Sequence, residues 1–395
     1  MPSNLTKFGS LKGSAEHLED DDGRFGLRST EFYNNPAAPP GEHYYFIPGS
    51  YTWVCPVGVS SISVVCIGGG GGASQNNFIQ GLPFSGSSGG GGTLAYKNNI
   101  PVVEGQGYDL FVGAGGAAQA STNANSPPTT FGGDGETSWF NNTSTVAAGG
   151  GHGGGAWPFH GGFTQAAAPV GDGGGRGGLS NNSSGHPIAN GIAGGGGAGG
   201  YAGEGGGWVA GAVFSSPVHV PAQANSGAGE AGFVGFDINL SNRNQNSGPG
   251  GGVGVYGLGA TATQFGEAGS NGRHASLPAP NPAFKAVFSA SLGTWNTTLP
   301  PLTQRLPTWF VNGVGNPPEH NDANNSRAGI HGGGGGNQGL YPYVANNNSQ
   351  QGFNYGLPSA GGNGAVRIMW GTASLPRSFP STNTEESFSV TVQNN

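Results

Sequence analysis

The feature that most constrains this chain is a series of glycine runs. Glycine accounts for 83 of the 395 residues, about three times the share of roughly 7% found in ordinary proteins. Ordering a glycine costs more backbone entropy than ordering any other residue. A chain with this much glycine is therefore either disordered or held together by a dense set of compensating contacts.

Aromatic content and charge favour the ordered alternative. The chain contains 21 Phe, 11 Tyr and 7 Trp, and its formal net charge is only −7. Disordered chains usually combine few aromatic residues with a high net charge. The glycine runs also lack the strict Gly-X-Y period of collagen. We therefore expect a packed structure of another kind.

The glycine runs recur at irregular intervals, which argues against a solenoid with a fixed repeat. They occupy residues 68–72, 89–92, 113–116, 132–133, 149–155, 173–178, 194–200, 205–207, 250–252, 332–336 and 361–364. In the extended threefold geometry of polyproline II, all-glycine segments can lie side by side and pair their free N–H and C=O groups. This pattern predicts a polyglycine II-type bundle, with connecting loops at its two ends. The alternative is that the runs are flexible linkers between small strands.

Segments rich in aromatic and β-branched residues flank the runs and predict strands. Residues 44–53 and 61–67 predict two strands joined by a tight turn, and residues 93–97 and 108–112 predict a second such pair. Residues 365–370 predict a closing strand. Successive apolar residues at 63–67 indicate that both faces of that strand are covered. With no helical period, the fold class is all-β, with short antiparallel strands and long connecting loops.

Composition divides the chain into three parts. Residues 1–43 are polar and acidic and end in a proline-rich stretch, which predicts a docking arm and linker. Residues 44–371 form a glycine-rich domain with variable loops, of which 253–331 is a large insertion. Residues 372–395 form a C-terminal tail.

Sequence patterns that resemble catalytic motifs are expected by chance in so much glycine. Residues 86–90 match the G-x-S-x-G expression, and residues 252–257 match a dinucleotide-binding fingerprint. Neither has the strand-to-helix setting that its chemistry requires. We therefore predict that the chain is not an enzyme and binds no cofactor.

Metal and nucleic-acid binding are likewise not predicted. The acidic run at 19–22 would need an acidic residue at Leu18 to form a calcium loop. The histidines have no metal-site spacing, and His152 and His331, beside glycine runs, are assigned a structural role. Cys55 and Cys66 are predicted to be buried free thiols. The chain has no clustered basic surface for nucleic acid.

Aromatic residues in the loops are the candidates for binding, because Tyr and Trp supply contact area at low entropic cost. The alternative for any single ring is that it covers the glycine bundle, which has no side chains of its own. The predicted receptor-binding residues are Trp157, Phe159, His160, Trp208, Trp309, Phe310, Tyr341 and Tyr343, with Phe233 and Phe236 as further candidates.

Both ends of the glycine-rich region resemble a known family. YTWVCPVGV at 51–59, followed by SVVCI at 63–67 and five glycines, is similar to the opening of the phage glycine-rich domain. GAVRIMWG at 364–371 is similar to its close, and RSFPSTNT at 377–384 resembles virion proteins of marine cyanobacterial phages. The resemblance implies a tail-fibre or adhesin role. In some such proteins, polyglycine II helices form a sandwich whose distal loops contact the host.

The expected function is therefore a virion component that recognises a host surface polysaccharide or outer-membrane protein. Its expected partners are other virion proteins, bound through residues 1–43, and further copies of itself in a homo-oligomer. Its N-terminus, MPSNLTKFGS, lacks a secretory apolar core, so release by lysis is expected. The alternatives are a capsid decoration or head-fibre protein with a structural role only and, third, a non-viral matrix or ice-binding protein.

Overall fold

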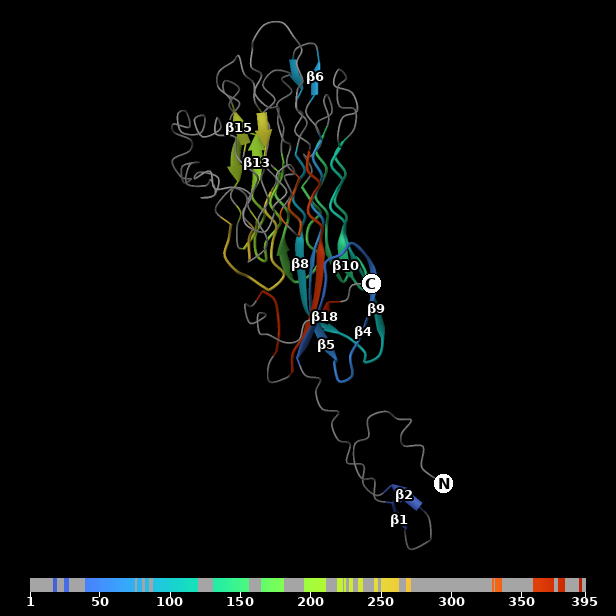
Figure 1. The fold of residues 1–395 in the computed structure, drawn as a ribbon. Coiled ribbons are helices and arrows are strands. Elements are labelled where there is room, and N and C mark those ends of the chain that lie inside the picture. The colour runs from blue at the N-terminus through green and yellow to red at the C-terminus, as the bar shows by residue number, and fades with distance from the viewer. Residues whose placement is uncertain are drawn as a thin grey trace.

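The computed structural model of the chain consists of strands, glycine runs and connecting segments (Figure 1). The structure describes residues 17–19, 25–27, 40–74, 77–79, 82–84, 88–119, 131–155, 165–180, 195–210, 219–222, 224, 227–229, 234–236, 245–247, 250–262, 268–270, 329, 331–335, 358–372, 376–380 and 391–392. Regular secondary structure in these ranges consists of strands, with no helix. This confirms the all-β prediction.

The larger of the two main sheets has six strands, in the order β12-β8-β5-β17-β3-β18. They span Gly173–Gly175 (β12), Leu94–Pro101 (β8), Ser61–Ile67 (β5), Ala365–Trp370 (β17), Gly41–Tyr45 (β3) and Thr391–Val392 (β18). All neighbours are antiparallel except β18, which is parallel to β3. The predicted closing strand, β17, lies between β3 and β5, so the sheet joins the beginning and the end of the glycine-rich region.

The second main sheet has four strands, in the order β11-β10-β9-β4. They span Val146–Ala148 (β11), Ser138–Phe140 (β10), Gly107–Val112 (β9) and Gly49–Val54 (β4). The remaining strands form four two-stranded hairpins. These are His17–Glu19 with Phe25–Leu27 (β1–β2), Asn77–Ile79 with Leu82–Phe84 (β6–β7), Gly207–Ala210 with His219–Ala222 (β13–β14) and Val234–Phe236 with Gln245–Ser247 (β15–β16).

In each of the two strand pairs predicted from the sequence, the two strands are not hydrogen-bonded to each other. Residues 44–53 contribute to two strands, β3 and β4, and β4 pairs with β9 while β5 pairs with β8 and β17. The predicted partners β8 and β9 also lie in different sheets. In both cases the turn carries the chain from one sheet to the other, a step of about 10 Å between packed sheets. The strands at 61–67, 93–97, 108–112 and 365–370 were predicted correctly, whereas 44–53 is divided between two strands and the predicted pairing was wrong.

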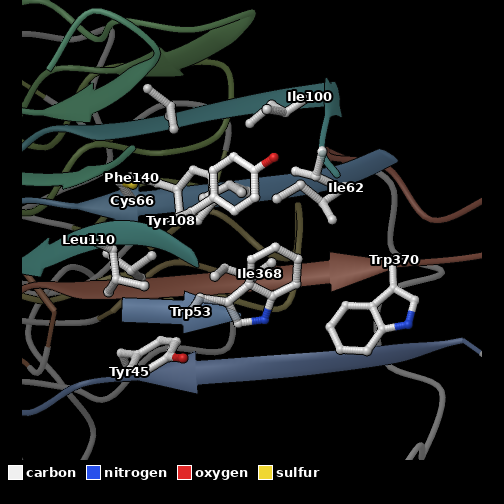
Figure 2. Packing of buried hydrophobic residues seen from close by; sticks show 14 of the residues in the cluster. Tyr45, Trp53, Ile62, Cys66, Ile100, Tyr108, Leu110, Phe140, Ile368 and Trp370 are labelled. Atoms are coloured by element: carbon white, nitrogen blue, oxygen red, sulfur yellow. The ribbon is translucent and has the colours of Figure 1, made fainter. Parts of the chain in front are cut away.

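Large side chains from both sheets fill the space between them (Figure 2). Trp53 of β4 lies among three other rings, with centroids 6.0 Å from Tyr108, 6.0 Å from Trp370 and 6.1 Å from Phe140. The six-stranded sheet adds an aliphatic surface that includes Ile62 and Ile368. Two sheets packed in this way form a β-sandwich.

Strand β5 is covered on both faces, as its run of apolar residues predicted. Its burial is complete or nearly so from Ile62 to Ile67. Val64 and Cys66 face the sandwich core. Val65 and Ile67 face a second cluster on the outer side of the sheet, where Tyr201 and residues 253–258 cover them.

The glycine runs continue from the sheet strands as extended segments joined by backbone hydrogen bonds, and we call each such segment a glycine rod. The rod at residues 68–73, which follows β5, shows the pattern most fully. Each amide of this rod donates a hydrogen bond to a carbonyl of a neighbouring segment. In order from Gly68 to Ala73, the accepting carbonyls belong to Thr93, Glu136, Gly362, Gly90, Gly133 and Ser359. The acceptors return to the same neighbouring segment every third residue. This threefold period confirms the polyglycine II prediction.

Six rods surround residues 68–73. Three of them accept hydrogen bonds from its amides: 89–93, 132–136 and 359–362. Three others donate hydrogen bonds to its carbonyls: 113–119, 149–155 and 332–335. The three rods of the first group run antiparallel to residues 68–73, and the three rods of the second group run parallel to them. Residues 68–73 are buried and belong to no β-sheet. Hydrogen bonds to several rods satisfy their backbone N–H and C=O groups instead.

The rods lie too close together for side chains at most of their glycines. A Cβ added to Gly70 would lie 2.0 Å from the carbonyl oxygen of Gly333, and one added to Gly91 would lie 2.0 Å from that of Gly197. Backbone atoms of a neighbouring rod cannot move aside as a flexible side chain can. Gly90 differs, because its nearest neighbour would be the Gly178 oxygen at 3.5 Å, an ordinary contact distance.

At one end of the bundle the rods do not lead into free loops, which differs from the expectation of loops at both ends. Strand β5 runs into Gly68, β9 into Gly113, and a rod runs through Gly364 into β17. The β-sandwich therefore takes up this end of the bundle (Figure 1).

Burial shifts the titration of groups in the sandwich core. It raises the pKa of Tyr45 to about 12, with a smaller contribution from Tyr51. It also raises the pKa of the Cys66 thiol. Cys55 and Cys66 are both free and buried, as predicted, and their thiols are held in the neutral form.

We predict opposite outcomes for alanine at two adjacent positions of one rod. Gly91→Ala places its methyl group against the Gly197 carbonyl, so it should lower the free energy of unfolding by about 2–3 kcal/mol or more. In Gly90→Ala the added methyl group meets no close atom. This variant should change the free energy of unfolding by less than about 1 kcal/mol, in either direction. Urea unfolding followed by tryptophan fluorescence measures both. Equal destabilisation by the two variants would contradict the close packing of the rods.

We also predict that Tyr45 makes the fold sensitive to alkali. The phenol titrates at about 12 in the folded protein and near 10 when unfolded. Its contribution to stability is therefore fully present below pH 10 and is lost as the pH rises towards 12. Tyr45→Phe should show a shallower decline than the wild type between pH 10 and 12, measured as the free energy of unfolding. Parallel declines would disprove this assignment.

Candidate recognition surface

The boundary between sandwich and bundle sets the position of the rods that continue from sandwich strands. The apolar residues that adjoin the glycine runs at this boundary are buried: Ile67, Leu94, Val112, Ala148 and Ala365. The glycines of the rods have no side chains that could fix one rod against the next, and only a few other rod residues do so, such as Asp134, which accepts from the Gly153 amide at 2.7 Å. The sheet registers do most of this, because the rods at 68–73, 89–93, 113–119, 132–136, 149–155 and 359–364 adjoin strands whose side chains are locked in a core.

Three hairpins lie toward the end of the bundle that is distant from the sandwich (Figure 1). Along the chain, hairpin β6–β7 connects the rod at 68–73 to the rod at 89–93, and these two rods are antiparallel neighbours. Hairpin β13–β14 separates residues 205–206 from 227–229, and Gly206 donates to the Gly229 carbonyl. Hairpin β15–β16 separates 227–229 from 250–252, and a Cβ added to Gly229 would lie 2.4 Å from the Gly251 carbonyl oxygen. Each hairpin thus begins and ends on rods that already lie side by side.

Of the eight predicted receptor-binding residues, the structure describes Trp208. It lies in β13, paired with Pro221 of β14. The other seven lie outside the described residues: Trp157, Phe159, His160, Trp309, Phe310, Tyr341 and Tyr343. Phe236, a further candidate, lies in β15, opposite Gln245. The structure therefore places two of the sequence candidates on hairpins of the distal end.

The aromatic residues of the first hairpin were not among the predicted binding residues. Phe78 of β6 is paired with Pro83, and Phe84 of β7 is paired with Asn77. The signal was present as a short segment rich in apolar residues between two glycine runs, divided near Gly81. These residues belong to the same candidate surface as Trp208, by their position on a distal hairpin.

The motif-like sequences have structural roles in the bundle. Ser88 of the G-x-S-x-G match is fully buried and leads directly into the rod at 89–93, with no helix after it. Val253, in the fingerprint match, is buried against the six-stranded sheet. These positions lack the exposed serine or the helix N-terminus that the corresponding chemistry needs.

The two histidines beside glycine runs differ in environment. His331 is buried, and its ring is hydrogen-bonded to the hydroxyl of Tyr44 in β3, so its predicted structural role is confirmed. His152 is partly exposed, with Nδ1 3.6 Å from a carboxylate oxygen of Asp134. In the portion of the chain that the structure describes, no three His, Cys, Asp or Glu residues are grouped to hold a metal ion. The same portion contains no helix able to span a membrane.

A buried ionic cluster on the six-stranded sheet was not predicted. Glu42 of β3 accepts hydrogen bonds from Arg367 of β17 and from Arg377, each at 2.5 Å. Arg367 also donates to the Val255 carbonyl at 3.0 Å, and the ring of Tyr256 lies 4.6 Å from its guanidinium carbon. Two cations thus share one buried carboxylate. The extra positive charge is offset by carbonyl oxygens and a ring face.

The same cluster attaches the segment at residues 376–380 to the outer face of the sheet. Arg377 donates to the Gly41 carbonyl, and its own carbonyl accepts from Ser63. Asn98 of β8 makes two hydrogen bonds with the backbone of Phe379, at 2.7 and 2.8 Å. Phe379 itself is buried against Tyr201. Side chains from β5 and β8 therefore hold a segment that joins no strand ladder.

The fold and its surfaces define a class: an all-β protein in which a sandwich supports a polyglycine II-type bundle with hairpins at its far end. The sequence model of the glycine-rich domain family matches residues 46–280, more than half of the chain. The chain therefore belongs to the glycine-rich domain family. No curated protein sequence matches it.

We predict unequal effects for the members of the buried ionic cluster. Glu42→Gln leaves two buried guanidinium groups without a counter-charge, and it should lower the free energy of unfolding by about 3–5 kcal/mol. Arg377→Met leaves the pair of Glu42 and Arg367 intact, so its effect should be clearly smaller. Urea denaturation at neutral pH measures both variants. A larger effect of Arg377→Met would show that the charge balance is not what stabilises the cluster.

Proposed function

We propose that the chain is a bacteriophage virion component of the tail-fibre or adhesin type, which binds a host surface receptor through the distal hairpins and loops. The observation that carries this proposal is the polarity of the fold. A side-chain core occupies one end of the rod bundle, and the hairpins between rods lie at the other. The similarity of both ends of the glycine-rich region to phage glycine-rich domain proteins supports the same assignment.

The bundle suits recognition because it makes the hairpins start from fixed points. Its rods are held by backbone bonds to several neighbours at once, so the ends of each hairpin lose little freedom on binding. Binding loops on a rigid support pay less ordering entropy than loops on a mobile one. A host polysaccharide or an outer-membrane protein is the proposed target, since aromatic side chains such as Trp208 suit sugar faces and apolar receptor loops.

Attachment to the particle is proposed to use the opposite end. Strand β3 begins at Gly41, opposite Trp370 at the end of β17. Since β17 leads away from the rods, Gly41 lies at the end of the sandwich farthest from the bundle. The proposed docking arm, residues 1–43, therefore joins the fold at the end remote from the hairpins, and its partners are other virion proteins.

Immunogold labelling of purified virions is the first test, with an antibody raised against residues 253–331. Gold at the distal end of the tail or its fibres is the expected result. Gold spread over the head would replace the adhesin proposal with the alternative, a capsid decoration or head-fibre protein. Absence of label, together with absence of the chain from virion mass spectrometry, would overturn the assignment to the particle.

Adsorption of the purified chain to host cells tests the binding role directly. Trp208→Ala, on hairpin β13–β14, should weaken adsorption about tenfold or more, as loss of a central aromatic contact does. Trp139→Ala is the matched control, because Trp139 is partly buried on β10 of the sandwich and stacks on Phe111 at 6.3 Å. Its adsorption should equal that of the wild type. Equal losses in both variants would argue against a receptor site on the hairpins.

A further inference from the structure

Strand β4 lies at an open edge of the four-stranded sheet. It pairs with β9 on one side. On its other side, no strand among the residues placed by the structure pairs with it. The far edge of the same sheet, β11, is partly closed, because Ala147 exchanges two backbone hydrogen bonds with Val170. The free ladder of this sheet is therefore on β4.

Two hydrogen bonds show which backbone groups face that edge. Cys55, just after β4, donates its amide to the Gln106 carbonyl, on the β9 side. The carbonyl of Asp109, opposite Thr52, instead accepts from Asn141, on the β10 side. In an antiparallel pair, bonded positions alternate along the strand. Residues 49, 51, 53 and 55 therefore bond to the β9 side, and the N–H and C=O groups of Ser50, Thr52 and Val54 point to the open edge.

This edge lacks the features that prevent strands from pairing with other chains. Natural edge strands are usually blunted by lysine, proline, a bulge or very short length. Strand β4 has six residues, Gly-Ser-Tyr-Thr-Trp-Val, with no charge and no proline. Its register with β9 runs without a shift over all six positions. It presents a regular, uncharged ladder.

Exposed apolar side chains gather around the same strand. Phe46 and Ile47 precede it, and Val54 and Val57 lie at its end, with exposures from 37% to 60%. Val103, 62% exposed, lies in the adjoining loop, where Gly105 donates to the Cys55 carbonyl. Five of the eight large exposed apolar residues in the described ranges thus lie on or beside β4. Such a concentration marks an interaction surface.

We infer that the open edge of β4 pairs with the β4 edge of a second copy of this chain, about a twofold axis. Thr52 lies opposite Thr52 of the copy, and Ser50 lies opposite Val54 in both directions. These are the residues whose N–H and C=O groups face outward, so the pairing forms a regular antiparallel ladder. The two four-stranded sheets then continue as one sheet across the dimer.

The arrangement of apolar residues favours a second copy over an unrelated strand. Ile47 lies five residues before Thr52, and Val57 lies five residues after it. A twofold axis at Thr52 therefore brings Ile47 of each copy toward Val57 of the other. An isologous interface requires this kind of self-complementarity. Strand β4 itself contributes no charge that would repel the second copy. The inference does not depend on the proposed receptor role.

Proline at Thr52 tests the inference in the full chain. The Thr52 amide faces the open edge, and proline is tolerated at such positions of an edge strand. Thr52→Pro should leave the far-UV circular dichroism unchanged and raise the dimer dissociation constant roughly tenfold or more, because two central hydrogen bonds are lost. Val54→Lys should act similarly, by placing charge on the edge. Analytical ultracentrifugation measures the dissociation constants.

Two controls separate the edge from the side chain. Thr52 donates its hydroxyl to Asp109 at 2.9 Å, and proline removes that bond as well. Asp109→Ala breaks the same bond and leaves the edge intact, so it should remain a dimer, as should Thr52→Ser. A monomeric wild type would overturn the inference. So would a dimer that persists in both Thr52→Pro and Val54→Lys, or one that Asp109→Ala dissociates equally.

Cysteine cross-linking tests the register. Opposed residues of a bonded antiparallel pair have Cα atoms about 5.5 Å apart, within disulfide range. Thr52→Cys should therefore form a disulfide-linked dimer under mild oxidation. Ser50→Cys should not, because Ser50 of one copy lies opposite Val54 of the other. The native thiols, Cys55 and Cys66, are buried and should not interfere. Cross-linking of Ser50→Cys without Thr52→Cys would overturn the proposed register.

Discussion

Backbone hydrogen bonding between glycine rods is the interaction on which this structure depends. Each amide of residues 68–73 bonds to a different neighbour from the one before it, with the cycle repeating after three residues. Bonds in several directions require the rods to approach from all sides, and this is possible only where no Cβ stands between them. The glycine content is therefore a consequence of how the backbone is satisfied. The entropy lost in ordering glycine is offset by a bonded backbone throughout the bundle.

Backbone bonding between glycines has no means of selecting one register by itself. A glycine rod that slides by three residues meets the same pattern of donors and acceptors. The sandwich resolves this degeneracy, because its core contains side chains of distinct shape, with Trp53 among three other rings. The buried cluster of Glu42 and two arginines adds a second specific contact on the other face of the sheet. Side-chain packing specifies the arrangement, and backbone bonding extends it.

Much of the fold could be predicted from the sequence, because its signals are local. Glycine runs and successive apolar residues in β5 indicated the rods and the doubly covered strand. The pairing of β4 and β5 could not be predicted, since a burial pattern shows that a face is covered and not which strand lies beside it. The ionic cluster joins residues more than 300 positions apart, beyond any local pattern. For the candidate surface, aromatic residues near glycine runs pointed to Trp208 and Phe236 but missed Phe78 and Phe84.

The alternation of rod directions has a mechanical consequence. The rod at residues 68–73 lies beside both parallel and antiparallel neighbours, and its hydrogen bonds run across its length. Tension applied to a hairpin along the bundle would stress many of these bonds at the same time, in shear, and could not open them one after another as a zipper opens. The sandwich, reached through covalently continuous strands, receives that tension. A particle that attaches by such a bundle would therefore withstand pulling along its axis far better than peeling from its side.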